Sequence, residues 1–191
     1  MTIDRARAAE AIDTFLRALG RDPSTERDLI GTSHRVAAAF ADEICEGYAV
    51  DVDALLQAEV ISSERERTQI VVLRDIAVGT TCPHHLMPAT GTATVAFEAR
   101  EKVLGLGSIA RLVDAYAHRL TLQETIGQEV TEALMKHVSP AWAACRLVLS
   151  HGCIVARGER RHGTRVETLA MAGDISDATR AWLLGPMVVP G

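Results

Sequence analysis

The order in which the spacing of apolar residues changes along the chain is the feature that most restricts its fold. Residues 1–62 repeat apolar side chains at helical spacing, and the next stretch is rich in β-branched residues that indicate two strands. Two helices, two more strands and a last helix then follow. Strands that come in consecutive pairs do not build alternating β-α units, so we expect an α+β fold with a mostly antiparallel sheet.

The expected elements fall into two regions. The N-terminal helical region, residues 1–62, should contain helices at 4–19, from 32 or 33 to 47 with Thr32 or Ser33 as cap, and at 51–60. The rest of the chain, residues 63–191, should contain strands at 69–76, 91–97, 144–155 and 164–171, helices capped by Ser108 and Thr121, and a helix at 176–184. Residues 80–88 are too irregular for either kind of element.

The overall composition narrows the class of protein. Twenty basic against 25 acidic residues give a net charge of −5, which gives no sign of a nucleic-acid-binding surface. The first residues lack the apolar core of a signal peptide, and no run of about 18 apolar residues predicts a membrane span. We therefore expect a cytoplasmic protein without a nucleic-acid or membrane partner. There the four cysteines should be thiols or metal ligands, not disulfides.

The strongest chemical pattern joins Cys82-Pro-His84-His85 with His151-Gly-Cys153. Zinc takes cysteine sulfur and histidine nitrogen, with four protein ligands in structural sites and three plus water in catalytic sites. Both segments lie at predicted strand ends, where distant parts of a chain can meet. The pattern allows a closed site or an open site with spare histidines. The alternative is that the two cysteines are buried apolar thiols.

Three arginines, Arg35, Arg111 and Arg157, are candidates for an anion site. Arg111 follows Gly105-Leu-Gly-Ser108, where a helix N-terminus could also donate N–H groups to a phosphate or carboxylate. The alternative for each arginine is a solvated surface side chain.

Glu124 also has two interpretations. Thr121-Leu-Gln-Glu124 matches a capping box, in which the glutamate bonds back to the cap residue. A carboxylate at this position could instead bind two adjacent N–H donors on the edge of a guanine-type ring. The residues alone favour the cap.

Taken together, the motifs resemble the GTP cyclohydrolase I family. The matching segments occur in the family's order and cover about residues 30 to 173. They are Thr32-Ser-His-Arg-Val36 with Asp42-Glu-Ile44, Val72-Leu-Arg-Asp-Ile76, Cys82-x-His-His85, Gly91-x-Ala-Thr-Val-Ala96, Gly105-Leu with Ile109-x-Arg111, Arg119-Leu-x-Leu-Gln-Glu124, and His151-x-Cys-x-x-x-Arg-Gly158.

The resemblance implies a tunnelling fold, in which an antiparallel four-stranded sheet is backed by two long helices. It also implies a homo-oligomeric ring, usually a decamer, with active sites between subunits. Zn²⁺ would be bound by Cys82, His85 and Cys153, and water in the fourth position would attack C8 of a guanine-type purine. His84 and His151 would be the catalytic acid and base.

Gln123 and Glu124 match the family's residues that recognise the pyrimidine edge of the purine, which replaces the capping interpretation of Glu124. Arg35, Arg111 and Arg157 match cationic positions that contact the substrate. We therefore expect a zinc-dependent cyclohydrolase, a hydrolase acting on cyclic amidine C–N bonds, with a small purine as substrate.

Three departures from the family pattern concern the part of the substrate beyond the base, and a fourth removes a carboxylate near the expected metal. Gly107 and Ser108 replace a serine and a lysine, Ala38 replaces a second lysine, and Pro83 replaces a glutamate between the Cys and His. Charge-assisted contacts to phosphate are typically worth about 1.5–3 kcal/mol each, so two missing lysines should weaken triphosphate binding strongly.

Three functions remain open at this point. The first is an ordinary GTP cyclohydrolase I in which Ser108, Arg160 or Arg161 compensates for the lysines. The second is the same ring opening on a purine without a triphosphate, such as 8-oxoguanine, urate or a nucleoside. The third is a zinc-stabilised ring assembly that binds a purine without catalysis.

Overall fold

The computed structural model describes residues 3–62, 69–158 and 160–185 of the 191-residue chain. Its main sheet has four antiparallel strands in the order β2-β3-β5-β6. The strands are β2 (Gln69–Cys82), β3 (Met87–Ala99), β5 (Trp142–His151) and β6 (Val166–Gly173). This confirms the expected α+β class and the antiparallel four-stranded sheet. The expected boundary between residues 62 and 63 falls at segment 63–68, which lies outside the described residues.

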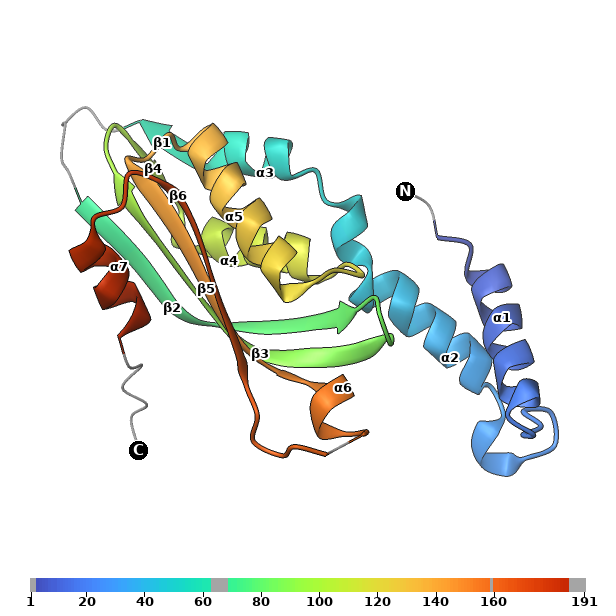
Figure 1. Ribbon diagram of the computed structural model, residues 1–191. Helices are drawn as coiled ribbons and strands as arrows, with labels where there is room; N and C mark the ends of the chain where they lie inside the picture. The colour runs from blue at the N-terminus through green and yellow to red at the C-terminus, as the bar shows by residue number, and fades with distance from the viewer. Residues whose placement is uncertain (1–2, 63–68, 159, 186–191) are drawn as a thin grey trace.

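The two long helices α4 (Leu106–Ala117) and α5 (Gln123–His137) cover one face of this sheet, as the tunnelling fold predicts (Figure 1). Side chains alternate along a strand, so successive residues of β5 serve opposite faces. Cys145 and Leu147 join the core beneath these helices, with both side chains fully buried. Ala144 instead faces the last helix, α7 (Asp177–Leu184), whose Leu183 covers the opposite face.

A buried arginine fixes α7 to the sheet. Arg146 of β5 is 7% exposed, and its guanidinium donates hydrogen bonds to the carbonyls of Leu183 and Gly185, each at 3.2 Å. It also donates to the Glu167 carboxylate on β6 at 2.7 Å. These bonds satisfy carbonyls that the C-terminus of a helix leaves without internal partners.

The N-terminal part consists of helical segments, and the first two α-helices pack against each other as a hairpin that projects from the sheet. The segments are α1 (Arg5–Ala18), η1 (Arg27–Leu29), α2 (Thr32–Ala39), η2 (Phe40–Ile44), η3 (Glu46–Ala49) and α3 (Val52–Glu59). Figure 1 shows that α1 and α2 extend away from the sheet. By contrast, Leu56 of α3 is fully buried in the main core. After α3, the short strand β1 (Val60–Ser62) pairs with β4 (Lys102–Leu104).

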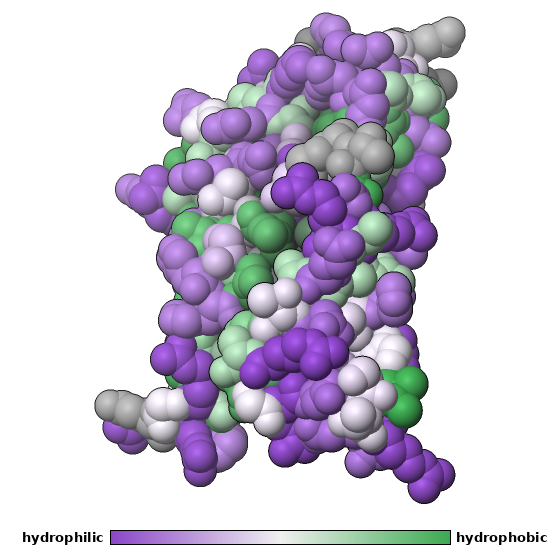
Figure 2. Space-filling view, turned by 90° about the vertical axis from the view of Figure 1, so that its right-hand side faces the viewer, coloured by the Kyte–Doolittle hydropathy of each residue, from purple (hydrophilic) through white to green (hydrophobic). Residues whose placement is uncertain are grey.

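The apolar stripe of α1 is only partly buried within this chain. Phe15 is 59% and Leu19 61% exposed, although their spacing predicts an inward face. In the space-filling view of this side of the molecule, hydrophobic residues appear as separate areas among hydrophilic ones (Figure 2).

Several predicted boundaries are wrong. Residues 80–82 and 87–88 belong to β2 and β3, so only residues 83–86 form an irregular turn. The predicted strand at 144–155 ends at His151, and residues 152–155 form the short helix α6 (Gly152–Val155). The first and last helices and α3 are confirmed, with Asp4, Ser176 and Asp51 as side-chain N-caps.

Three predicted caps are wrong, because each of these helices begins after a residue whose side chain has no hydroxyl. Gly31, with φ of 77°, precedes α2, and neither Thr32 nor Ser33 caps it. Gly105 precedes α4, so Ser108 lies inside the helix. Leu122 precedes α5, so Thr121 lies before the helix and no capping box forms. Within the described residues, no helix is long and apolar enough to cross a membrane.

Candidate active site

The first part of the site is the tip of the β2-β3 hairpin. Cys82 is the last residue of β2, pairs with Met87, and is 9% exposed. The turn is closed by a hydrogen bond from the Leu86 N–H to the Cys82 carbonyl at 2.9 Å. His84 and His85 lie in this turn and are exposed. The hairpin therefore places one buried thiol beside two accessible imidazoles.

The second part is the end of β5 and the helix that follows it. His151 is the last residue of β5 and pairs with Ala89 of β3, and Cys153 lies in α6. Gly152 is in close contact with the hairpin, since a Cβ there would lie 3.0 Å from the Pro88 carbonyl oxygen. A larger residue would push α6 away from β3, so glycine allows the two segments to lie side by side.

The three predicted zinc ligands, Cys82, His85 and Cys153, therefore come from segments in contact. Within the described residues, however, no three His, Cys, Asp or Glu side chains form a group that could hold a metal ion. The chemistry of the donor set still fits zinc, because two thiols and one imidazole leave a fourth position open in a tetrahedral site. The remaining cysteines, Cys45 and Cys145, are buried, and burial raises the pKa of Cys145 to about 12.

His151 is held by a buried amide at the start of α5. Gln123 is 2% exposed, and its side-chain oxygen lies 2.7 Å from His151 Nε2. The amide nitrogen donates to the carbonyls of Leu147 at 3.1 Å and Val166 at 3.0 Å, and to the Thr168 hydroxyl at 3.1 Å.

These contacts also assign the proton on His151. The Gln123 nitrogen faces two carbonyl oxygens, so its oxygen must face the histidine and accept a hydrogen bond. Nε2 is therefore the donor, and in the neutral ring Nδ1 is the nitrogen that can accept a proton. The Gln123 side chain is fully used inside the protein, whereas that of the adjacent Glu124 is exposed in the first turn of α5.

The structure does not bring the three candidate arginines together in one chain. Arg35 lies on α2 and donates to the Ile30 carbonyl at 3.0 Å and the Thr32 hydroxyl at 2.8 Å. Arg157 is exposed in the turn after α6. Arg111 lies on α4, where it bonds to Glu59 and Ser108, each at 3.0 Å.

Gly107 and Ser108, two of the four positions that depart from the family pattern, differ in their surroundings. Ser108 is 1% exposed, whereas a Cβ at Gly107 would meet nothing within 4 Å. No sequence motif singles out Glu59, which lies 52 residues before Arg111 and is the last residue of α3. Only the pairing of β1 with β4, which joins Val60 to Leu104, brings it to the start of α4.

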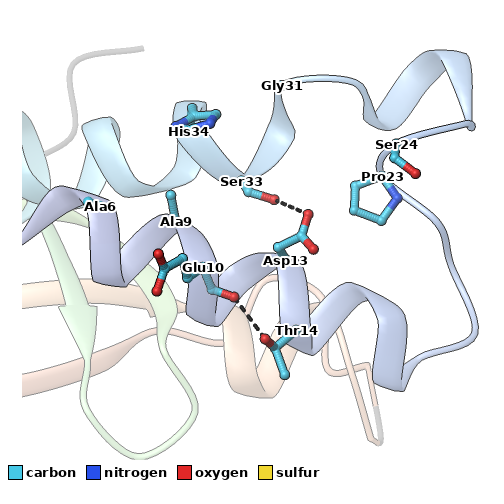
Figure 3. A pocket seen from close by; sticks show the side chains of 10 residues that line it. All are labelled: Ala6, Ala9, Glu10, Asp13, Thr14, Pro23, Ser24, Gly31, Ser33 and His34. Atoms are coloured by element: carbon cyan, nitrogen blue, oxygen red, sulfur yellow. Dashed lines mark hydrogen bonds between the residues drawn. The ribbon is translucent and has the colours of Figure 1, made fainter.

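Two of the cavities in the described part of the chain lie between α1 and α2 and beside the β2-β3 hairpin. One, of about 520 Å³, lies between α1 and α2 and contains none of the predicted site residues (Figure 3). Part of its polar lining is bonded between α1 and α2, as in the contact between the Ser33 hydroxyl and the Asp13 carboxylate at 3.5 Å. The other cavity, of about 440 Å³, lies against the β2-β3 hairpin, and its lining includes Thr80, Thr81 and Pro88.

Comparison with known proteins gives a consistent result across most of the chain. The family model described as GTP cyclohydrolase I matches residues 8–183. GTP cyclohydrolase 1 of Leifsonia xyli subsp. xyli is 36% identical over 182 residues, covering 95% of this chain and 94% of that protein. GTP cyclohydrolase 1 of Caldanaerobacter subterraneus subsp. tengcongensis is 34% identical over 172 residues, covering 90% and 89%.

A third relative, GTP cyclohydrolase 1 of a Synechococcus species, is 35% identical over 170 residues, covering 89% of this chain and 72% of that protein. Among solved structures, the archaeosine synthase QueF-Like in the apo form matches with a TM-score of 0.48 and 20% identity. That match covers 58% of this chain and all of the other.

Proposed function

The chain belongs to the GTP cyclohydrolase I family, and from this premise we propose that it hydrolyses the imidazole ring of a guanine-type purine at C8. The observation that supports the proposal is the contact of Gly152 with Pro88, because it sets side by side the segments that carry two thiols and three imidazoles. Cys82, His85 and Cys153 would hold zinc. When bound, the metal supplies a Lewis acid that makes water nucleophilic near neutral pH.

The histidines that are not ligands would move the protons. Hydrolysis adds water to C8 and breaks a C8–N bond, so one proton must leave the water and one must reach the departing ring nitrogen. His151 has Nδ1 free to accept a proton, because Gln123 fixes Nε2 as a donor. His84, exposed in the turn, is proposed as the partner that donates a proton to the ring.

Recognition of the base is assigned to Glu124, with Gln123 as a positioning residue. The Glu124 carboxylate is exposed and free of the predicted capping role, so it can accept hydrogen bonds from two adjacent N–H groups. The Gln123 side chain instead orients His151 through the contact between its oxygen and His151 Nε2.

A second candidate substrate is a purine without a triphosphate. Gly107, Ser108 and Ala38 provide no cation where the resemblance places a lysine or a ribose contact, and Arg111 is already paired with Glu59. GTP remains the first candidate because the relatives carry its name.

We also propose that the working form is a homo-oligomeric ring in the cytoplasm, with sites shared between subunits. Arg35 lies on the projecting α2, and Arg111 and Arg157 lie on separate elements (Figure 1). One chain therefore offers no common anion site made by these three arginines.

The test is a substrate panel with zinc-loaded protein: GTP, guanosine, guanine, 8-oxoguanine and urate, followed by absorbance, formate release and mass spectrometry. Ring opening of any of them that stops with a chelator and returns with zinc supports the proposal. Efficient conversion of GTP would exclude the altered-substrate candidate. Full zinc occupancy without turnover of any purine would favour a non-catalytic purine-binding assembly.

A further inference from the structure

Of the three candidate arginines, Arg111 is the one whose guanidinium lies at the start of α4. It already forms an ion pair with a carboxylate. Arg111 Nη2 donates to Glu59 Oε1 and to Ser108 Oγ, both at 3.0 Å. A Cβ on Gly105, the residue before α4, would lie 3.5 Å from Glu59 Oε2. Glu59 therefore lies over the start of the helix, where the backbone N–H groups favour an anion.

The surroundings of Arg111 add further negative charge. It lines a cavity of about 260 Å³ together with Glu46, Asp114 and His118. Burial, and the neighbouring charge of Glu46, raise the pKa of Asp114 above its ordinary value, while His118 opposes this. His118 Nδ1 lies 3.0 Å from Glu46. Among the described residues that line this cavity, the carboxylates of Glu46 and Asp114 outnumber Arg111, and Arg119 lies beside it, donating to the Gly47 carbonyl at 3.2 Å.

The position of Glu59 follows from local structure. It ends α3, and the next residue, Val60, pairs with Leu104 in the small β1-β4 sheet. Gly105 and α4 follow directly. The pairing thus sets the end of α3 against the start of α4. Because Glu59 is 39% exposed and Arg111 55% exposed at the side chain, their ion pair is weak in energy, and its effect is on local charge.

We infer that Glu59 is a specificity-determining residue, which cancels the charge of Arg111 and makes this end of α4 select against a phosphate chain on the substrate. The inference rests on the proposed ring opening and favours its second candidate substrate, because it names the substrate class of that same site as a purine base or nucleoside. A polyphosphate would have to displace one carboxylate and approach others. A neutral ribose or a bare base would meet no such repulsion.

The experiment uses the full-length protein with Glu59→Gln, which keeps the side-chain shape and its acceptor oxygen. The control is Glu132→Gln, an exposed carboxylate on α5 that makes the same change in net charge. Inorganic tripolyphosphate binding is measured by calorimetry, and thermal melts check that each variant folds. We expect Glu59→Gln to bind tripolyphosphate about tenfold more tightly than wild type at low salt, and the gain to shrink at about 0.5 M salt.

Turnover gives a second measurement. The ratio of kcat/KM for GTP to kcat/KM for guanosine should rise about tenfold in Glu59→Gln, through a lower KM for GTP, with guanosine turnover unchanged. Equal tripolyphosphate affinity in Glu59→Gln and wild type would overturn the inference, as would an equal gain in Glu132→Gln.

The two proposals fail separately. Because tripolyphosphate binding needs no catalysis, a tenfold gain without turnover of any purine would refute the proposed reaction and leave the role of Glu59 supported. Ring opening with unchanged tripolyphosphate affinity would do the reverse.

Discussion

Replacing Gln123 by alanine tests whether this amide positions His151. The change removes one acceptor for His151 and three donor contacts, to Leu147, Val166 and Thr168. A typical intramolecular hydrogen bond contributes about 1 kcal/mol net, and water can enter a polar cavity, so we expect a loss of about 2–4 kcal/mol in the free energy of unfolding. A domain with ordinary stability of about 5–15 kcal/mol would remain folded.

Activity should fall further than stability alone explains. Without its partner, the His151 ring can rotate and place its proton on either nitrogen, and loss of such an orienting contact typically costs about 10–100-fold in activity. The loss should appear in kcat with little change in KM, because the Gln123 side chain is buried away from the substrate. Urea unfolding and steady-state kinetics measure the two effects.

The matched control is Gln128→Ala, an exposed glutamine on the same helix, which should change neither quantity. Wild-type kcat in Gln123→Ala would refute the positioning role. A KM that rises while kcat holds would instead return Gln123 to direct recognition of the purine.

Three further expectations follow from single contacts. Cys153→Ala should lose zinc and turnover, His151→Ala should lose only turnover, and Cys145→Ala should keep both; zinc is measured by elemental analysis. Arg146→Met should lower the free energy of unfolding by about 2 kcal/mol and speed hydrogen exchange in α7, because two of its carbonyl contacts are lost. Hydrogen bonds from Lys136 and His137 hold the pKa of Asp53 below its ordinary 3.8. Its stabilising contribution is therefore present above pH 3.8 and is lost as the pH falls through the pKa of Asp53 in the folded state. Asp53→Asn should therefore unfold at lower urea than wild type at pH 7, and this difference should vanish in acid.

The fold was largely predictable because the spacing of apolar residues is set by burial, and burial is set by the sheet and helices themselves. The antiparallel sheet and the two helices between its strand pairs agree with the pattern. Helix starts were less predictable, since Gly31 begins α2 through a left-handed backbone rather than a hydroxyl cap. The apolar run Cys153-Ile-Val155 indicates a strand, yet it forms a helical turn after the chain leaves the sheet at His151.

The sequence indicates the chemistry of the candidate site, which stays a prediction, but it does not indicate which residues lie beside the site. The motif around Cys82 and the one around Cys153 indicate a metal because their residue types are unusual together. The resemblance assigns Gln123 to the substrate, whereas its contacts with His151, Leu147, Val166 and Thr168 depend on tertiary structure that the motif does not reveal. Glu59 was missed because its relation to Arg111 depends on tertiary pairing across 52 residues.

The chemical centre and the phosphate end of the proposed site differ in how tightly they are packed, and this difference bears on substrate choice. The proposed chemical centre lies on the hairpin tip and α6, where Gly152 is in close contact with Pro88 and leaves little freedom for substitution. The proposed phosphate end lies on α3 and α4, where Glu59 is partly exposed and Gly107 meets nothing within 4 Å. Substitutions of Glu59 or Gly107 at the phosphate end cost little in packing energy, whereas substitutions at the chemical centre would move a thiol or an imidazole. A member of this family could therefore lose its affinity for a triphosphate while its ring-opening residues stay in place, and the Glu59–Arg111 pair is the contact at which that change can be measured.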